Sequence, residues 1–466
     1  MKNRISLFSL IMLIVAAVAS IRTLPSNAFF GSSLIFFYLM ASLFFLLPIS
    51  LISAEFSSRF SSEGGVFHWI RYAFGDRMGV LAVWLQWINT MVWYPTLLLF
   101  IASTASYLLS PVFSHHKFFL LVMSLVIFWG LTLLNLRGIQ VSSKLNSLCG
   151  TIGTLLPMSI LIILAILWSV SGKSLAISFS WSDLLPSVNL LEASSSLVAI
   201  MTSFLGMELA GVYVNEIAHP QKNFPKAIGI AVLILLTALI FGSLAIAVIL
   251  PKHEIHFVDG VMQTFIVCLT RFKLAFLAPF FAFLIMVGGT GGSINWLLSP
   301  AHGLFQAAEK GFFPAFFLVK NRYGVSYRIL VLQACVVSLF CFAIHFALNL
   351  NTYYWFLMAL STGLYMMVYV LLFLAALKLK RTDVGYQIPW GLRTISCISG
   401  LGAALVTMVV GFQPPPEMDI ENRVLYVFLI IVGFCLTIMP VTLLWRYQKR
   451  ATLRDRKEIN ATLRRG

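Results

Sequence analysis

The sequence predicts an all-α polytopic membrane protein, and three observations support this fold class. Hydrophobic residues make up 60% of the 466 residues and charged residues only 10%, whereas soluble globular domains carry roughly 25% charged residues. The mean hydropathy is +0.93. The apolar residues form continuous blocks of about 18 or more, the helix length that crosses a hydrocarbon core of about 30 Å. Continuous blocks exclude a membrane β-barrel, whose strands are alternating segments of about ten residues.

Twelve blocks have the length of membrane-spanning helices. The first follows Lys2 and Arg4 and also resembles a secretory signal peptide with a cleavage site near 17–19. We expect a retained helix instead, because many spans follow it and no exported domain separates them. The predicted spans cover residues 5–27, 30–54, 79–109, 117–136, 147–170, 192–216, 225–250, 274–307, 327–348, 353–378, 393–412 and 422–446, within a single transmembrane domain, 1–466.

The net charge of +16 reflects membrane topology rather than nucleic-acid binding. With the N-terminus placed in the cytoplasm, 25 of the 32 Lys and Arg residues fall on the cytoplasmic side and six on the outer side. This bias predicts that both termini are cytoplasmic. The basic tail, 447–466, is expected to lie on anionic lipid of the bilayer.

Two charged residues lie well inside predicted spans, the carboxylate Glu208 and the cation Arg22. A charge in hydrocarbon is costly and marks a functional site by default. In the segment 198–220, Ser203 and Gly206 precede Glu208 closely, and a glycine there permits a break that exposes backbone groups. The sequence therefore predicts an interrupted helix with its break at 203–207.

Three arrangements of Arg22 and Glu208 remain open. The two side chains pair until a ligand carboxylate competes for Arg22, whose guanidinium fork matches a carboxylate. Alternatively, they form a fixed ion pair that neutralises both charges. Or they do not touch. If Glu208 instead faces apolar surroundings, burial favours its protonated form and permits coupling to protons.

Faint internal symmetry accompanies these charges. Small residues at 16–20 are followed by Pro25, and Ser203 and Gly206 are followed by Pro220. Interruptions in the first helices of two five-helix units are typical of inverted repeats. The predicted repeats are 1–170 and 192–378, and the last two spans occupy 393–446.

Several segments resemble the bacterial glutamate/γ-aminobutyrate antiporters of acid resistance, within the amino acid–polyamine–organocation superfamily. The segments are PSNAFFGSSLIFF (25–37), SAEF…EGGVFHWI (53–70), SFLGMELAGVYVNEIAHPQKNFP (203–225), GVMQTF (260–265) and GFQPPPEMD (411–419). Their order and spacing run over nearly the whole chain. The resemblance implies a LeuT-type 5+5 inverted repeat plus two C-terminal helices in a bacterial inner membrane. It also implies a secondary active amino acid transporter that works by alternating access.

The resemblance implies a substrate held between spans 1, 3, 6, 8 and 10, with Glu208 in a proton-coupling or gating role. Three departures matter: Arg22 replaces an aromatic wall residue of the antiporters, Gly292 replaces their second glutamate, and 18–20 lacks the Gly-Ser-Gly type of break. The expected substrate-binding residues are Ala19, Ser20, Arg22, Ser203, Phe204, Gly206, Met207 and Trp296.

The favoured function is antiport of an acidic or neutral amino acid, with its amine as one candidate counter-substrate; the alternative is a proton-coupled symporter of the same fold. Arg22 disfavours a cationic substrate. An enzyme is not expected, because the spans hold no catalytic set beyond Arg22 and Glu208, and no cofactor or metal is expected. The loop histidines His115, His116, His253 and His256 are interpreted as solvated. The glycines at 288–292 are interpreted as a site of close helix packing or a flexible segment of the span 274–307, rather than a phosphate loop. The sequence leaves the oligomeric state open.

Overall fold

The computed structural model describes residues 5–60, 65–137, 149, 151–185, 197–346, 349–380, 385–414 and 423–463. Within these residues the secondary structure is helical, apart from an isolated bridge between Ile5 and Ile217. Parts of some predicted features lie outside the described residues. They include the starts of the spans 147–170 and 192–216, the end of 327–348, residues 61–64 and 415–419 of the quoted motifs, and 464–466 of the tail.

Ten helices of the described chain are long and apolar enough to cross a membrane, and they match ten of the predicted spans. The other two correspond to α15 (Tyr327–Phe342), a shorter apolar helix, and to the interrupted segment that contains Glu208. The ten are built from α1 (Leu7–Val18) with α2 (Leu24–Ala28), α3 (Leu34–Ala41) with α4 (Leu47–Arg59), α6 (Asp76–Ser106), α7 (Lys117–Asn135), α9 (Leu156–Val170), α12 (Pro220–Ile249), α14 (Ala278–Glu309), α16 (Leu350–Lys378), α17 (Trp390–Val410) and α18 (Arg423–Leu463).

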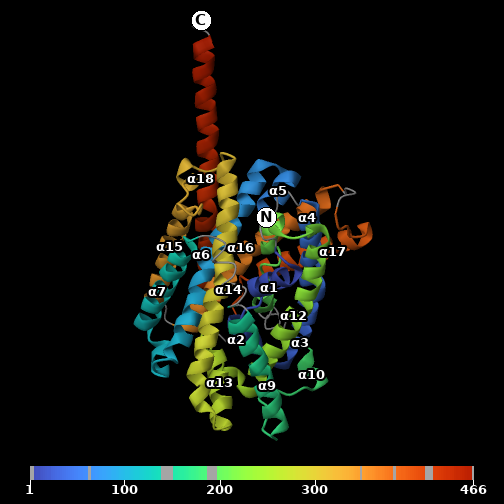
Figure 1. Ribbon diagram of the computed structural model, residues 1–466, viewed down its shortest axis with the longest axis vertical. Helices are drawn as coiled ribbons and strands as arrows, with labels where there is room; N and C mark the ends of the chain where they lie inside the picture. The colour runs from blue at the N-terminus through green and yellow to red at the C-terminus, as the bar shows by residue number, and fades with distance from the viewer. Residues whose placement is uncertain are drawn as a thin grey trace.

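Helix α6 is the central element of the bundle. Its most apolar window is 100% buried, and it packs against α14, α16, α7 and the short helix α5 (Val66–Phe74). Helix α18 projects beyond the bundle at the end where α5 lies, whereas α9, α10 (Trp181–Leu184) and α13 (Gly260–Arg271) lie at the opposite end (Figure 1). Because α6 is surrounded by protein, its polar residues face other helices rather than lipid.

Two membrane-embedded helices are interrupted. Helix α1 ends at Val18, Ala19 and Ser20 are extended, and the 3-10 turn η1 (Ile21–Thr23) leads into α2. The second helix continues to Thr202, and turn residues 203–208 separate it from the 3-10 helix η6 (Leu209–Glu216). The break predicted at 203–207 is therefore confirmed. Gly206 has a φ of 102°, a conformation that a residue with a Cβ rarely adopts.

The glycine-rich stretch 288–292 lies inside the continuous helix α14. A Cβ on Gly288 would lie 2.1 Å from the backbone oxygen of Gly153, which belongs to the π-helical segment η5 (Thr151–Leu155). The two backbones touch only because both residues lack side chains. Of the two interpretations left open by the sequence, a flexible segment and close helix packing, the structure has close packing within a continuous helix.

This contact makes Gly288→Ala strongly destabilising, because the new methyl group meets backbone that cannot rotate away. Overpacking of this kind costs about 1–3 kcal/mol or more. The matched control is Gly292→Ala on the same helix, where the nearest atom to the new Cβ would be the Ala16 oxygen at 3.4 Å. We expect thermal unfolding of the detergent-solubilised protein to show a clearly lower midpoint for Gly288→Ala than for Gly292→Ala. Equal midpoints would contradict the close contact.

Candidate functional site

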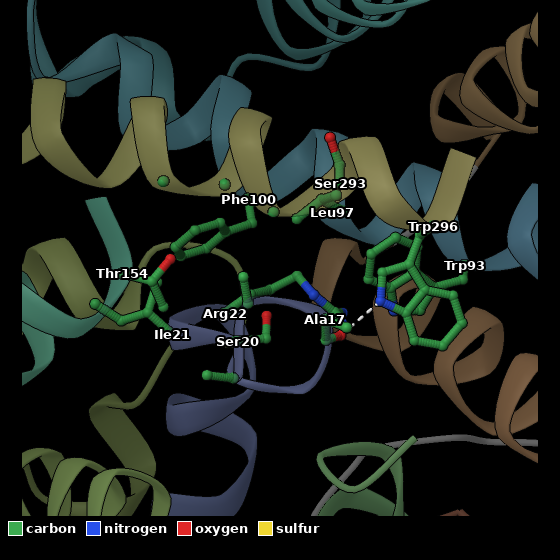
Figure 2. A pocket seen from close by; sticks show the side chains of 15 residues that line it. Ala17, Ser20, Ile21, Arg22, Trp93, Leu97, Phe100, Thr154, Ser293 and Trp296 are labelled. Carbon is green, nitrogen blue, oxygen red and sulfur yellow. Dashed lines mark hydrogen bonds between the residues drawn. The ribbon is translucent and has the colours of Figure 1, made fainter. Parts of the chain in front are cut away.

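A small cavity lies where the break after α1 faces α6 and α14 (Figure 2). The extended residues Ala19 and Ser20 form one wall, and Arg22 on η1 reaches along it. Opposite them, α6 contributes Trp93 and α14 contributes Trp296. The full lining is Ala16, Ala17, Ala19, Ser20, Ile21, Arg22, Trp93, Leu97, Phe100, Thr154, Gly288, Gly289, Gly292, Ser293 and Trp296.

Trp296 joins α14 to the broken helix. Its indole N–H donates a 2.7 Å hydrogen bond to the carbonyl oxygen of Ala17 (Figure 2). That carbonyl belongs to the last turn of α1, which the break leaves without its full set of helical partners. A nonhelical backbone at membrane depth is tolerated where protein groups satisfy it or where it lines a cavity, and this break meets both conditions.

Arg22 is buried, with 1% of its surface exposed. Its Nη1 donates to the hydroxyl oxygens of Thr96 at 2.9 Å and Tyr354 at 2.8 Å. The guanidinium carbon also lies 5.2 Å from the centroid of the Trp93 ring, within the range of a cation–π interaction. These neighbours are neutral, so the positive charge of Arg22 is solvated but not neutralised by them.

Arg22 has donors left over, because only its Nη1 forms hydrogen bonds among the described residues. Its Nε is buried and has no hydrogen-bond partner among the described residues. A buried donor without a partner costs free energy, and an arginine is built to bind a carboxylate with two parallel hydrogen bonds. Because Arg22 lines the cavity, this arrangement suits the binding of an anionic group there.

Glu208 is also buried, at 1% exposure, and hydroxyl groups of α16 hold it. The hydroxyl of Tyr365 donates to Oε1, the hydroxyl of Tyr369 donates to Oε2 at 2.8 Å, and Gln86 Nε2 donates to Oε1 at 3.3 Å. Three donors thus satisfy both carboxylate oxygens, as burial of such a group requires.

Arg22 and Glu208 do not form an ion pair in this structure. Arg22 bonds to Thr96 and Tyr354, while Glu208 bonds to Tyr365, Tyr369 and Gln86, and no salt bridge joins the two residues. Of the three arrangements left open by the sequence, the described structure has the one without contact. Each charge has its own set of neutral partners.

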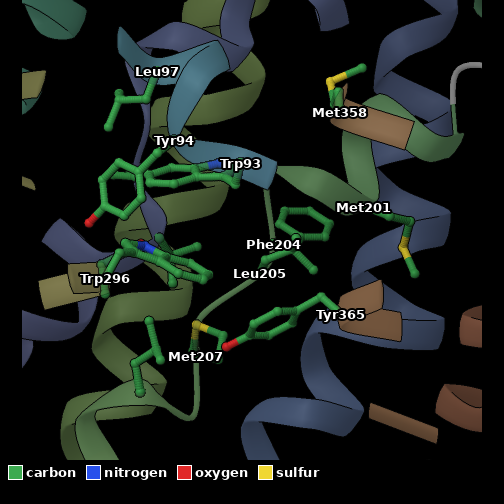
Figure 3. Close-up of a cluster of buried hydrophobic side chains, with 14 of the residues drawn as sticks. Trp93, Tyr94, Leu97, Met201, Phe204, Leu205, Met207, Trp296, Met358 and Tyr365 are labelled. Atoms are coloured by element: carbon green, nitrogen blue, oxygen red, sulfur yellow. The ribbon is translucent and has the colours of Figure 1, made fainter. Parts of the chain in front are cut away.

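Seven of the eight expected substrate-binding residues fall into two adjoining zones. Ala19, Ser20, Arg22 and Trp296 line the cavity. Phe204 and Met207 are fully buried and lie in the aromatic cluster beside Trp296 and Tyr365 (Figure 3). A Cβ on Gly206 would lie 2.7 Å from the Trp296 ring, so the tryptophan packs here because Gly206 has no side chain. Ser203 lies apart from the cavity lining, and its hydroxyl accepts a 2.8 Å hydrogen bond from Asn27.

Sequence reasoning missed most partners of the two charges. Thr96, Tyr354 and Tyr369 carry neutral hydroxyls, which are common in membrane helices and give no strong signal alone. Gln86 was recognisable, because an amide inside a predicted span at 79–109 is costly unless it is bonded. Trp93 was not singled out either, although it stacks on Trp296 with ring centroids 5.2 Å apart.

Comparison with known proteins confirms the resemblance seen in the sequence. The family profile described as amino acid permease matches residues 5–435. An uncharacterized transporter of Legionella pneumophila is 36% identical over 457 residues, covering 96% of this chain and 97% of that protein. A glutamate/gamma-aminobutyrate antiporter of Lactococcus lactis is 27% identical, over 96% of this chain and 92% of its own length. A probable agmatine/putrescine antiporter of Lactococcus lactis is 26% identical, over 82% of this chain and 81% of its own length.

The environment of Arg22 can be tested with two adjacent tyrosines. Tyr354→Phe removes an acceptor from a buried cation, whereas Tyr353→Phe removes a neutral hydrogen bond to the carbonyl oxygen of Phe340. Hydrogen bonds to charged groups contribute about 1.5–3 kcal/mol and neutral ones about 0.5–1.5 kcal/mol. We expect Tyr354→Phe to lower the free energy of unfolding in detergent by the larger amount. Equal losses would mean that Tyr354 does not support the Arg22 charge.

Proposed function

We propose that this chain, which belongs to the amino acid permease family of the amino acid–polyamine–organocation superfamily, is an amino acid antiporter that works by alternating access. Family membership makes it a membrane transporter rather than an enzyme. The observation that carries the proposal is Arg22, a buried cation at the wall of a cavity, whose Nε has no hydrogen-bond partner among the described residues. The cavity also lies at a helix break, where transporters of related architecture hold substrates.

The substrate carboxylate is proposed to bind Arg22. The Nε donor together with the guanidinium fork would receive it, and backbone groups and the hydroxyl at Ser20 would bind its other polar atoms. A second carboxylate in the cavity would compete for the same cation. Gly292, which lines the cavity, provides no such competitor and leaves Arg22 available to the substrate.

The proposed gate consists of two aromatic side chains, Trp296 and Tyr365, that connect the cavity beside Arg22 to Glu208. Trp296 forms a wall of the cavity, its ring lies 5.5 Å from Tyr365, and Tyr365 donates to Glu208. A change in the charge of Glu208 alters the hydrogen bond from Tyr365, and Tyr365 contacts the tryptophan that closes the cavity. Glu208 is thus proposed to act on the cavity through Tyr365 and Trp296 rather than by touching Arg22.

The proposal includes the topology expected from the sequence. It comprises twelve spans, a 5+5 inverted repeat over 1–170 and 192–378, two further helices, and both termini in the cytoplasm of a bacterium. The paired interruptions in α1 and in the segment before η6 support the repeat, and the bias of Lys and Arg supports the orientation.

An acidic or neutral amino acid is the proposed substrate class, with its decarboxylated amine as a candidate counter-substrate. One relative of this chain is named a glutamate/gamma-aminobutyrate antiporter, and another is named a probable agmatine/putrescine antiporter. Arg22 repels dications such as putrescine, so the first pair is the better guide to the substrate class.

A proton-coupled amino acid symporter is the second candidate, and Glu208 favours it. Among the described residues, the partners of Glu208 are tyrosines and a glutamine rather than a cation. Carboxylates inside membrane helices form proton relays in pumps and transporters, and this is the role that symport requires of Glu208.

One experiment separates the two candidates. The purified protein is reconstituted in liposomes, and a panel of radiolabelled amino acids and amines is tested at two pH values. Antiport predicts efflux from preloaded vesicles only when substrate is present outside. Uptake into empty vesicles driven by a pH gradient alone would instead establish symport, and transport of no amino acid in either format would overturn both.

Arg22→Ala tests the substrate site. Losing a charge-assisted hydrogen bond costs about 1.5–3 kcal/mol, so we expect the apparent KM for the transported amino acid to rise roughly tenfold to hundredfold. Arg22→Lys keeps the charge but loses the fork, and should be intermediate. Arg271→Ala, an exposed cation on α13, is the control. An unchanged KM in correctly folded Arg22→Ala would remove Arg22 from the site.

Glu208→Gln tests the coupling role. Glutamine has nearly the same shape but does not titrate. Tyr365 and Tyr369 donate to different oxygens of Glu208, so the single amide oxygen of glutamine keeps one of these hydrogen bonds, and its NH2 group faces the other tyrosine as a donor. We expect the variant to transport at a rate that no longer changes with pH, measured between about pH 5 and pH 8. The wild-type protein provides the reference profile. A variant profile that follows the wild-type one would show that another group responds to pH.

A further inference from the structure

Two loops that are far apart in the sequence meet at the end of the bundle where α13 lies (Figure 1). One is the 3-10 turn η4 (Pro111–His115), which precedes α7. The other lies between η7 (Lys252–Glu254) and α13. His115 comes from the first loop, and His256 and Asp259 come from the second. The imidazole rings of the two histidines are 5.1 Å apart at their centroids.

The carboxylate of Asp259 lies between the two histidines. His115 Nε2 is 3.5 Å from Asp259 Oδ2, and His256 Nδ1 is 3.3 Å from Asp259 Oδ1. One nitrogen or oxygen from each of the three residues lies within 4.8 Å of the other two. Both separations are longer than a good hydrogen bond between charged groups, which is about 2.7–2.9 Å. Each is close to the distance of about 3.3 Å between two ligands of a tetrahedral ion with bonds of about 2.0–2.1 Å, although His115 faces Oδ2 and His256 faces Oδ1. A small rotation of the carboxylate would bring one oxygen to both nitrogens.

Asp259 is itself built like a ligand. Its side chain is 4% exposed, and its Oδ1 is buried without a hydrogen-bond partner in the described part of the chain. Its Oδ2 accepts a 3.0 Å hydrogen bond from the hydroxyl of Tyr107 at the end of α6. Such an outer partner fixes the orientation of a metal-binding carboxylate.

The histidine side chains are about half exposed, at 55% for His115 and 44% for His256, so an ion can reach the cluster from solvent.

We propose that His115, His256 and Asp259 bind a divalent transition-metal ion, with Zn²⁺ as the best fit. Two imidazole nitrogens and one carboxylate oxygen are a common zinc donor set, and water would complete a tetrahedron. The sequence suggested only solvated loop histidines, because the ligands come from two separate loops and lack the short spacing of a metal motif.

A bound ion would tie these two loops together near the substrate cavity. Phe257, between two of the ligands, packs against Phe29 on one side and against Tyr354 on the other, with ring centroids 5.3 Å and 6.2 Å apart. Tyr354 is the acceptor that holds Arg22. The ion would therefore stabilise the layer that covers Arg22 at this end of the bundle.

The test uses the full-length protein purified in detergent without a polyhistidine tag and stripped of metal. Zn²⁺ is titrated by calorimetry, and Co²⁺ is added separately to record the absorption of a tetrahedral site. We expect one ion per chain, a higher thermal unfolding midpoint with Zn²⁺, and at least a tenfold loss of affinity in His115→Ala and in Asp259→Asn. His253→Ala, an exposed neighbour at 81% exposure, should bind as the wild type does.

Two results would overturn the site. One is the absence of stoichiometric binding by the wild type at micromolar Zn²⁺. The other is wild-type affinity in both His115→Ala and Asp259→Asn, which would place the ion elsewhere. His115 lies on an exposed turn, so its variant gives an answer even if Asp259→Asn fails to fold. None of these measurements requires transport, so the result is independent of the proposed function.

Discussion

The buried guanidinium of Arg22 imposes the strongest constraint on this structure. A cation inside a membrane protein must be solvated by protein groups, and here two hydroxyls and an aromatic face perform that role. None of them neutralises the charge. The helix break beside Arg22 and the indole of Trp296, which bonds to the freed backbone, complete a polar region within an apolar bundle. A carboxylate ligand would supply the neutralising charge that the protein omits.

Helix α16 serves both charged groups. Tyr354 accepts from Arg22, and Tyr365 and Tyr369 donate to Glu208. These tyrosines are spaced by eleven and four residues, which places them along one face of a helix. Helix α6 also contributes to both sites, because Gln86 donates a hydrogen bond to Glu208 and Thr96 accepts one from Arg22. A shift of either helix relative to the broken segments would change the surroundings of both charges together. Arg22 and Glu208 are therefore coupled through these helices although they do not touch each other.

The sequence predicted the parts of this arrangement that depend on composition and local backbone chemistry. Apolar blocks located ten of the twelve predicted spans as long apolar helices. Gly206 ahead of Glu208 located the break, because a charge inside an apolar block and a helix-breaking glycine can both be recognised in the sequence alone. The partners of the charges were not predictable in the same way. Thr96 and Tyr354 reach Arg22 from distant helices, and neutral hydroxyls give little warning. From the charged residues alone, an ion pair between Arg22 and Glu208 remained one of the open arrangements. The structure instead surrounds each of these two charges with neutral groups.

This use of neutral partners bears on how a transporter can select an anion without trapping it. A fixed ion pair between Arg22 and Glu208 would have to break for each substrate, and breaking a buried pair costs several kcal/mol. The hydroxyl partners do not have to be displaced by the substrate. Thr96 and Tyr354 can keep their hydrogen bonds to Nη1 while Nε binds the ligand. Glu208 is held by Tyr365 beside Trp296, and in the proposal this carboxylate responds to protons separately from the substrate. In the proposed mechanism, recognition and gating therefore belong to different charges, and Trp296 is the side chain that borders both.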